Sequence, residues 1–380
     1  SRDRILLLEK KLNELIIGHE NVVRSVILAI VAKEHVVMIS PPGTAKTMLA
    51  KSLAKMLEAK FYKYLLTRFT SDVEVLGPFD IPALKERGEL KRKWSRIKDA
   101  EIVFLDEVFK ANSAILNSLL AFMQERILYD PMSGEEVSTK LWTLIGASNE
   151  VPMDEELQAL YDRFAIRVFF DYISDDSMFL EALTKKWVEP VEVKPIASMD
   201  DVKALNKFVH KILSSTIKQL NKRFIEVYHV NTIPLIKELR TKGVMVSDRT
   251  VIEKMPKLVA SYLAVYGVTL DNLMNAVYDI LPYLARTRDE LAAIRKVIEN
   301  SLGEVAELMT KINQAREMIK AGRLNEAKEK LEEVLSFDLS KIANRPWLKP
   351  RAEALIQQAK KYLELVEKQL EALRALSEQI

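Results

Sequence analysis

The 380-residue sequence predicts an α/β fold, in which a parallel sheet flanked by helices is followed by helical segments. Across residues 1–172, short β-branched runs alternate with helical patterns, the order that a parallel sheet with crossover helices requires. Residues 202–287 carry helical patterns alone and are expected to form a smaller helical lid. Residues 288–380 place hydrophobic side chains at alternating three- and four-residue steps, which is typical of a coiled-coil seam.

The expected elements of the first segment follow one another at regular intervals. Strands are expected at residues 35–39, 61–67, 101–105, 141–147 and 166–170, and helices at 47–57 and 113–124. Residues 173–201 lose this regularity and contain Pro190 and Pro195. Because proline interrupts regular structure, we expect a linker there.

The last segment is expected to form a helical hairpin. One seam runs from Leu291 to Ile312 and a second from Ile356 to Leu373, with breaks at 321–322 and 344–346. A short helix over Leu324–Leu335 would connect the two long arms. Packing within the chain is favoured over a partner-binding arm, although the seam pattern fits both.

Composition excludes several kinds of site. There is no cysteine, which excludes disulfides, zinc-thiolate centres, iron–sulfur clusters and thiol nucleophiles. The four histidines show no metal-ligand spacing, and the net charge of +3 neither indicates nor excludes nucleic acid. With no N-terminal apolar segment bearing a cleavage pattern and no run of about 18 apolar residues, we expect a cytoplasmic protein without a membrane span.

A degenerate phosphate-binding loop lies at "SPPGTAKT", after a β-branched run. Ser40 and Ala45 replace the two glycines of the pattern G-x-x-x-x-G-K-[ST]. Such a loop binds phosphate through successive backbone N–H groups at a helix N-terminus, and a lysine adds charge. Serine and alanine are the smallest substitutes for glycine. The candidate binding residues are Ser40, Pro41, Pro42, Gly43, Thr44, Ala45, Lys46, Thr47 and Met48.

A second motif, "EIVFLDE", is an apolar strand that ends in two carboxylates. Asp106 is the candidate ligand of Mg²⁺ opposite the Thr47 hydroxyl, and Glu107 the candidate general base for an attacking water. A helix cap is the alternative interpretation of such a pair, but an apolar strand ending in Asp-Glu after a phosphate-loop candidate favours the nucleotide site. Asn149 ends the next strand, and Arg163 carries a guanidinium suited to phosphate charge.

Taken in order, these motifs resemble those of the AAA+ ATPases, and within them the MoxR family, most closely its RavA branch. The resemblance runs from "IIGHENVVRSVILAI" to "ALYDRF" and "VSDRT", over about residues 10–285. It implies Walker A for Lys46 and Thr47, Walker B for Asp106 and Glu107, sensor 1 for Asn149 and an arginine finger for Arg163. It also implies that Arg249 is the sensor 2 arginine of the lid, that Ile17, Gly18 and His19 line the adenine, and that Arg126 is a second interface arginine.

The same resemblance implies a function. It implies a homo-oligomer, with six subunits in a ring, that uses ATP and Mg²⁺ to remodel or mature partner proteins. A protein with a von Willebrand A domain is the expected partner. Residues 67–90 resemble the helix 2 insertion of this group, and residues 127–144 its hairpin before sensor 1.

Two alternatives stay open: a nucleic-acid translocase and an ATP-binding scaffold with little turnover. The basic run at 85–98 offers only Trp94 for base stacking, which disfavours nucleic acid.

Overall fold

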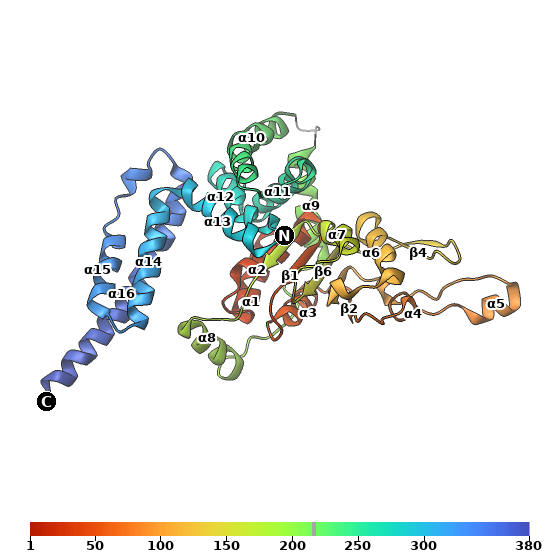
Figure 1. Ribbon diagram of the computed structural model, residues 1–380, viewed down its shortest axis with the longest axis horizontal. Helices are drawn as coiled ribbons and strands as arrows, with labels where there is room; N and C mark the ends of the chain where they lie inside the picture. The colour runs from red at the N-terminus through yellow and green to blue at the C-terminus, as the bar shows by residue number, and fades with distance from the viewer. Residues whose placement is uncertain (215–217, 380) are drawn as a thin grey trace.

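A five-stranded parallel sheet lies at the centre of the first part of the chain, in a computed structural model that describes residues 1–214 and 218–379 (Figure 1). The strands run in the order β2-β3-β6-β1-β7, and every neighbouring pair is parallel. Their bounds are β1 (Val36–Ile39), β2 (Phe61–Leu65), β3 (Ile102–Asp106), β6 (Thr143–Ser148) and β7 (Ile166–Phe169). The predicted α/β class is confirmed, and each strand ends within two residues of its predicted bounds.

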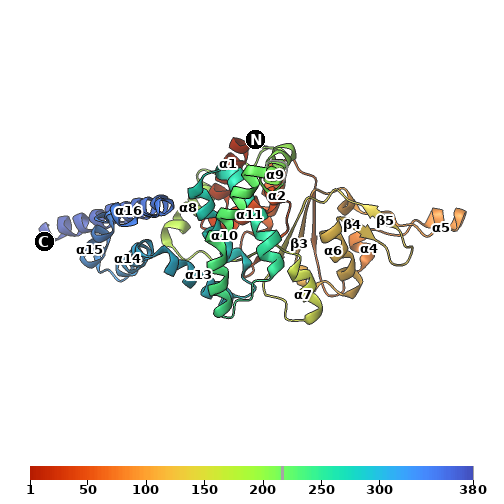
Figure 2. The same cartoon turned by 90° about the horizontal axis from the view of Figure 1, so that it is seen from above.

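Helices cover both faces of this sheet. One face carries α1 (Arg2–Leu15), α2 (Glu20–Ala32) and α3 (Lys46–Met56), and Figure 2 shows α6 (Ser113–Glu125) on the other side. The sequence of α2, ENVVRSVILAIVA, is apolar nearly all round, and side chains on every side of this helix are buried. A helix of that kind has to be enclosed by other elements.

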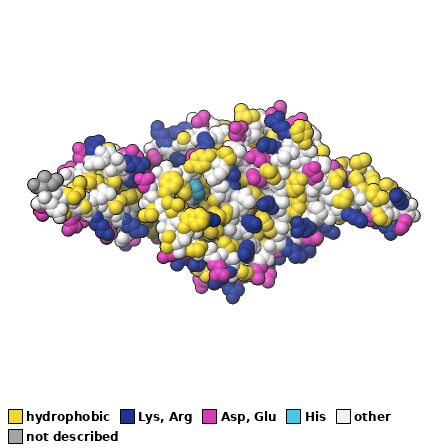
Figure 3. All heavy atoms as spheres, turned by 90° about the horizontal axis from the view of Figure 1, so that it is seen from below, with side chains coloured by type: hydrophobic (Ala, Val, Ile, Leu, Met, Phe, Trp, Pro, Cys, Tyr) yellow, Lys and Arg dark blue, Asp and Glu magenta, His cyan; other side chains and the backbone are white. Residues whose placement is uncertain are grey.

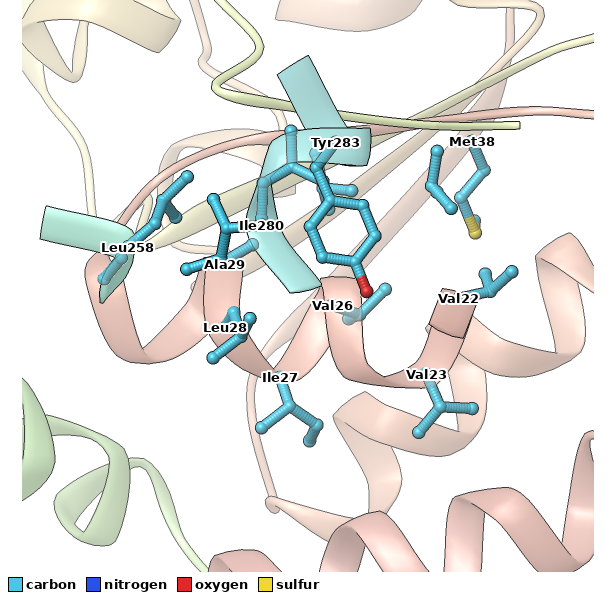
Figure 4. Packing of buried hydrophobic residues seen from close by; sticks show 14 of the residues in the cluster. Val22, Val23, Val26, Ile27, Leu28, Ala29, Met38, Leu258, Ile280 and Tyr283 are labelled. Carbon is cyan, nitrogen blue, oxygen red and sulfur yellow. The ribbon is translucent and has the colours of Figure 1, made fainter. Parts of the chain in front are cut away.

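The helical lid supplies that enclosure. It comprises α9 (Met199–Leu213), α10 (Lys218–Thr241), the π-helical turn η4 (Thr250–Lys254), α11 (Met255–Tyr266), α12 (Leu270–Ile280) and η5 (Leu281–Leu284). Figure 4 shows Leu258, Ile280 and Tyr283 packed against the side chains of α2. The Tyr283 hydroxyl donates to Asn21 O at 2.7 Å, and Arg167 of β7 donates to Leu284 O at 2.7 Å. The lid and the sheet therefore share one hydrophobic core.

A helix occupies much of the segment that the sequence predicts as a linker. It is α8 (Asp176–Trp187), and Asp175 caps it by accepting from Ser177 N at 2.9 Å. Hydrogen bonds from Ser177 and the nearby Arg316 guanidinium hold the pKa of Asp175 below its ordinary value. None of the α8 side chains is buried. The irregular structure expected at 173–201 is therefore wrong for residues 176–187, which form a helix.

The C-terminal segment forms four helices, with one break that the sequence did not predict. Its helices are α13 (Arg288–Leu302), α14 (Glu304–Lys320), α15 (Leu324–Leu335) and α16 (Lys349–Glu378), with turns η6 (Leu339–Ile342) and η7 (Pro346–Leu348). Gly303, at φ +56°, ends α13, which packs on the lid. The other three helices pack on one another, and the end of α16 extends beyond them (Figure 1). The seam residues Ile312 and Val366 are buried within the chain, as packing within the chain requires.

An arm and a hairpin project from the sheet on the side away from the C-terminal helices (Figures 1 and 2). The arm carries α4 (Asp72–Leu76), α5 (Ile81–Arg87) and η1 (Arg96–Lys98), and the hairpin pairs β4 (Ile127–Tyr129) with β5 (Glu136–Ser138). Arg92 joins them, because its buried guanidinium donates to Asp72 of the arm at 3.0 Å and to Asp130 of the hairpin at 3.4 Å. Among the described residues, no helix combines the length and apolar composition needed to cross a membrane.

Replacing Arg92 with methionine should loosen the arm and the hairpin together. The Asp130 carboxylate would stay buried without its counter-charge, which lowers the free energy of opening this region by about 3–5 kcal/mol. Hydrogen exchange of residues 77–95 and 127–138 measures that opening, and Lys93→Met, at an exposed neighbouring position, is the control. Unchanged exchange in both segments would show that Arg92 does not hold them together.

Candidate functional site

The predicted phosphate loop joins the carboxyl end of β1 to the first turn of α3. Gly43, at φ +80°, adopts the left-handed conformation that favours glycine. Ser40 is fully buried, and its Oγ lies 2.6 Å from Thr44 Oγ1, which also donates to Pro41 O at 3.1 Å. The serine that replaces the first glycine therefore fits into the loop, where its hydroxyl ties the two ends together.

Lys46 begins α3 and directs its ammonium back into the loop. Its Nζ donates to Ser40 O at 2.8 Å, to Pro41 O at 3.2 Å and to Asn149 Oδ1 at 3.3 Å. Burial lowers the pKa of Lys46, and the carboxylates of Asp106 and Glu107 partly oppose that shift. The lysine therefore lies between the loop and the carboxyl ends of β3 and β6.

The two carboxylates follow the end of β3 beside this lysine. Asp106 is the last residue of β3, and its Oδ1 accepts from Glu107 N at 2.9 Å. Glu107 has φ +53°, which is uncommon for a residue with a Cβ atom. Asn149 Nδ2 donates to Glu107 Oε1 at 3.2 Å. Asn149 thus contacts both Lys46 and Glu107, so residues from three separate strand ends meet at one edge of the sheet.

The donor set near Asp106 suits magnesium bound together with a nucleotide. The described residues contain no group of three or more His, Cys, Asp or Glu side chains that could hold a metal ion by themselves. Magnesium in nucleotide sites usually has one or two carboxylates, with phosphate oxygens and water as its other ligands. Thr47 and Asp106, at adjacent strand and helix ends, offer a hydroxyl and one carboxylate. These residues fit that binding mode.

A cavity of about 640 Å³ opens beside the loop. From the predicted set it is lined by Ile17, His19, Gly43, Thr44, Ala45 and Met48. Gly18 is not among the lining residues, and a Cβ atom there would approach Met178 Sδ to 3.0 Å. Burial lowers the pKa of His19, which favours a neutral ring. A largely apolar cavity next to a phosphate loop is suited to a flat heterocycle such as a purine.

Sequence reasoning missed the outer wall of this cavity, which comes from the end of the predicted core and from the segment predicted as a linker. Tyr172, Ile173 and Phe179 line it, and the Tyr172 hydroxyl donates to Pro42 O at 2.7 Å. Hydrophobic side chains gather on the face on which α8 lies (Figure 3). The signal that could have found this wall was the four-residue spacing of Phe179, Leu183 and Trp187 after the capping residue Asp175.

A second cavity, of about 680 Å³, lies at the opposite end of β1 and has an excess of basic side chains. Its lining includes Lys33, Arg126, Arg163, Arg167, Arg249, Lys254, Lys257 and Arg286, against Glu34, Asp162, Glu253 and Glu290. We call it the cationic cleft. Arg163 follows α7 (Glu155–Asp162), and its Nε is buried without a hydrogen-bond partner among the described residues. Arg249 is exposed and lies 3.2 Å from Glu253.

The structure therefore separates the predicted site residues into two groups. Ala165 N donates to the carbonyl of His35, the residue before β1, so the neighbouring Arg163 lies at the amino end of that strand. The phosphate loop follows the carboxyl end of the same strand. A strand of four residues spans about 13 Å. Arg163 is therefore remote from the phosphate loop of its own chain. Arg249 lies in the lid, as expected for a sensor 2 arginine, and α11 packs on α2, which keeps this part of the lid at the amino end of β1.

Arg126 is bonded within its own chain. Its guanidinium donates to Lys33 O at 2.9 Å and to Leu141 O and Trp142 O at 3.2 Å. Burial lowers its pKa. These bonds to carbonyl groups of its own chain hold the end of α6 against the sheet, and a role of Arg126 at an interface stays a prediction.

Comparison with known proteins matches residues 3–207 to the family described as the MoxR domain in the MoxR-vWA-beta-propeller ternary systems. An uncharacterized protein of Methanocaldococcus jannaschii is 36% identical over 245 residues, which are 64% of this chain and 61% of that protein. A second uncharacterized protein of the same organism is 29% identical over 367 residues, 92% of each chain. This chain thus spans less than two thirds of the first relative.

A solved structure supports the fold. It is a candidate ATPase from Cytophaga hutchinsonii, which aligns with a TM-score of 0.57 at 20% identity over 79% of this chain and 93% of its own. At that identity the likeness concerns the fold alone, whereas the family match covers more than half of this chain. The chain belongs to the MoxR family of AAA+ ATPases.

Proposed function

We propose that this chain hydrolyses ATP at sites formed between copies of itself, and that it uses the energy to remodel a partner protein. The observation that carries the proposal is that the charged groups lie at two opposite edges of the sheet. The lysine and the carboxylates lie at the carboxyl edge of the sheet, and the cationic cleft lies at the amino edge. Neither group alone provides both a phosphate cradle and a neighbouring guanidinium.

In this proposal the triphosphate binds along the loop and the purine lies in the cavity beside it. The backbone N–H groups of residues 43–47 and the Lys46 ammonium would hold the phosphates. Lys46 now donates to the neutral carbonyls of Ser40 and Pro41. Charged phosphate oxygens accept stronger hydrogen bonds than neutral carbonyls, so nucleotide would displace these contacts.

The chemistry follows from the groups that surround the terminal phosphate. Magnesium bound by Thr47 and Asp106 would neutralise phosphate charge. Glu107 would polarise the attacking water, and Asn149, already bonded to Glu107, would hold its carboxylate in place. Arg163 from the next copy would stabilise charge in the transition state, a contribution worth roughly 10³–10⁵ in rate in well-studied NTPases. Arg249 of that same copy would approach the same phosphates.

The proposed assembly is a hexameric ring, and the proposed partner carries a von Willebrand A domain. Support comes from the family description, which names systems that combine MoxR, vWA and β-propeller proteins. The α5 arm and the three-helix unit α14–α16 lie outside the nucleotide groups, so both are candidate docking regions. Placement in the RavA branch and a cytoplasmic location remain predictions from the sequence.

The nucleic-acid alternative loses support from the structure of the basic run at 85–98. Arg92 is bonded inside the molecule, and the Trp94 indole donates to Glu135 at 3.2 Å. Two of the side chains that would bind single-stranded nucleic acid are therefore already hydrogen-bonded within the chain. Measurement of ATP turnover with and without nucleic acid separates this alternative from the proposal.

Replacing Glu107 with glutamine, or Arg163 with alanine, should each lower ATP turnover by at least about 10³-fold, since each removes a group that acts on the transition state. An equal mixture of the two variants should recover activity above the sum of the separate proteins. In mixed assemblies, an Arg163→Ala subunit offers an intact Glu107 and a Glu107→Gln subunit offers an intact Arg163.

The exposed substitution Glu156→Gln on α7 is the control and should keep the parent rate. Parent turnover in both single variants would contradict the assignment of these residues. Inactive single variants that fail to complement each other would contradict catalysis across an interface.

Replacing Tyr172 with phenylalanine should weaken ATP binding about two- to fivefold, because one hydrogen bond that holds the loop at Pro42 is lost. Titration with a fluorescent ATP analogue measures this affinity. Tyr129→Phe, on the β4–β5 hairpin, serves as the matched control. Equal affinities for the two variants would show that Tyr172 does not organise the loop.

A further inference from the structure

The last turn of α7, which leads directly into Arg163, is bonded to the lid. Lys254 at the end of η4 donates from Nζ to Asp162 O at 2.8 Å. The last four carbonyl groups of an α-helix lack partners within the helix, and a cation at this end also interacts favourably with the helix dipole. Lys254 thus satisfies the carbonyl group whose peptide bond leads to Arg163.

A second basic residue, Arg286, which follows η5, also contacts the last turn of α7. The Arg286 guanidinium forms an ion pair with the Asp162 carboxylate and donates to Gln158 Oε1 at 2.8 Å. The Tyr161 hydroxyl in turn donates to Arg286 O at 2.7 Å. The backbone that carries Arg163 is therefore fixed on two sides, while the buried Nε of Arg163 has no partner among residues 1–214 and 218–379.

Lys254 and Arg249 belong to one short segment. Arg249 is the residue before η4, and Lys254 is its last residue. The exposed Arg249 and the bonded Lys254 therefore move with the same turn of the lid. Any rotation of that turn displaces Arg249 directly and displaces Arg163 through the Asp162 carbonyl.

We propose that Lys254 is a positioning residue that couples Arg163 to the lid, so that Arg163 and Arg249 enter the neighbouring copy's nucleotide site as one unit. This inference rests on the proposed function, because it presumes that Arg163 acts on a nucleotide held by another copy. Lys254 acts through Arg163, because its ammonium is bonded to Asp162 O. It sets the direction of a guanidinium whose contribution depends on position, since a misplacement of about 1 Å can cost 10²-fold in rate.

The full-length Lys254→Met variant tests the inference. Its kcat should fall about 10- to 100-fold. Its affinity for a fluorescent ATP analogue should equal that of the parent, because Lys254 lies at the opposite end of β1 from the phosphate loop. Lys254→Arg, which keeps a cationic donor, should recover most of the lost kcat. A residue needed only for folding would lower affinity and kcat together.

Lys203→Met is the matched control. Lys203 of α9 joins the lid to the core through Glu101, at 4.0 Å, but it lies outside the cationic cleft and makes no bond to the turn before Arg163. Its loss should therefore leave kcat within about twofold of the parent. A fall equal to that of Lys254→Met would overturn the specific role of Lys254.

Mixing experiments separate this inference from the proposed function. Lys254→Met mixed with Glu107→Gln should recover activity, because the defects lie on opposite sides of an interface. Lys254→Met mixed with Arg163→Ala should not, because both defects lie on the same side. If Arg163→Ala complements Glu107→Gln but Lys254→Met keeps the parent kcat, the role of Lys254 is overturned and the proposed function stands. If Arg163→Ala itself keeps the parent rate, the proposed function fails first.

Discussion

The enclosure of α2 between the sheet and the lid is the contact on which the rest of the structure depends. Because α2 is apolar on nearly all sides, it is stable only when both surfaces are covered. The sheet covers one side, and α9 and α11 cover the other. This packing fixes the lid at the amino edge, so its arginine joins Arg163 and not the phosphate loop. The division of the site is thus a consequence of hydrophobic packing.

At each edge of the sheet, polar groups lack the partners that suit them best. At the carboxyl edge, Lys46 is bonded to neutral oxygens although phosphates would be better acceptors. At the amino edge, basic side chains outnumber acidic ones and the buried Nε of Arg163 has no partner in the described chain. Natural proteins tolerate such unsatisfied groups mainly where function needs them. In the proposed assembly, one copy would supply the phosphate loop, Lys46 and the carboxylates, and the next copy would supply the arginine.

Local patterns predicted much of this molecule, and long-range packing determined what they missed. The five strands and the Lys46, Asp106 and Glu107 groups follow from residues adjacent in sequence. The helix α8 was missed because Pro190 and Pro195 favoured a linker over the apolar spacing before them. The break at Gly303 was missed because the hydrophobic steps continue through it. The location of Arg249 depends on how α11 packs on α2, two helices more than 200 residues apart, which no local pattern encodes.

The most direct test of the divided site is ATP turnover per subunit as a function of protein concentration, with particle mass followed by light scattering. The account predicts that turnover per subunit rises with the assembled fraction, whereas single chains still bind ATP through their own loop. Full turnover per subunit at dilutions where only single chains exist would contradict it, because one chain would then be supplying both edges of the site.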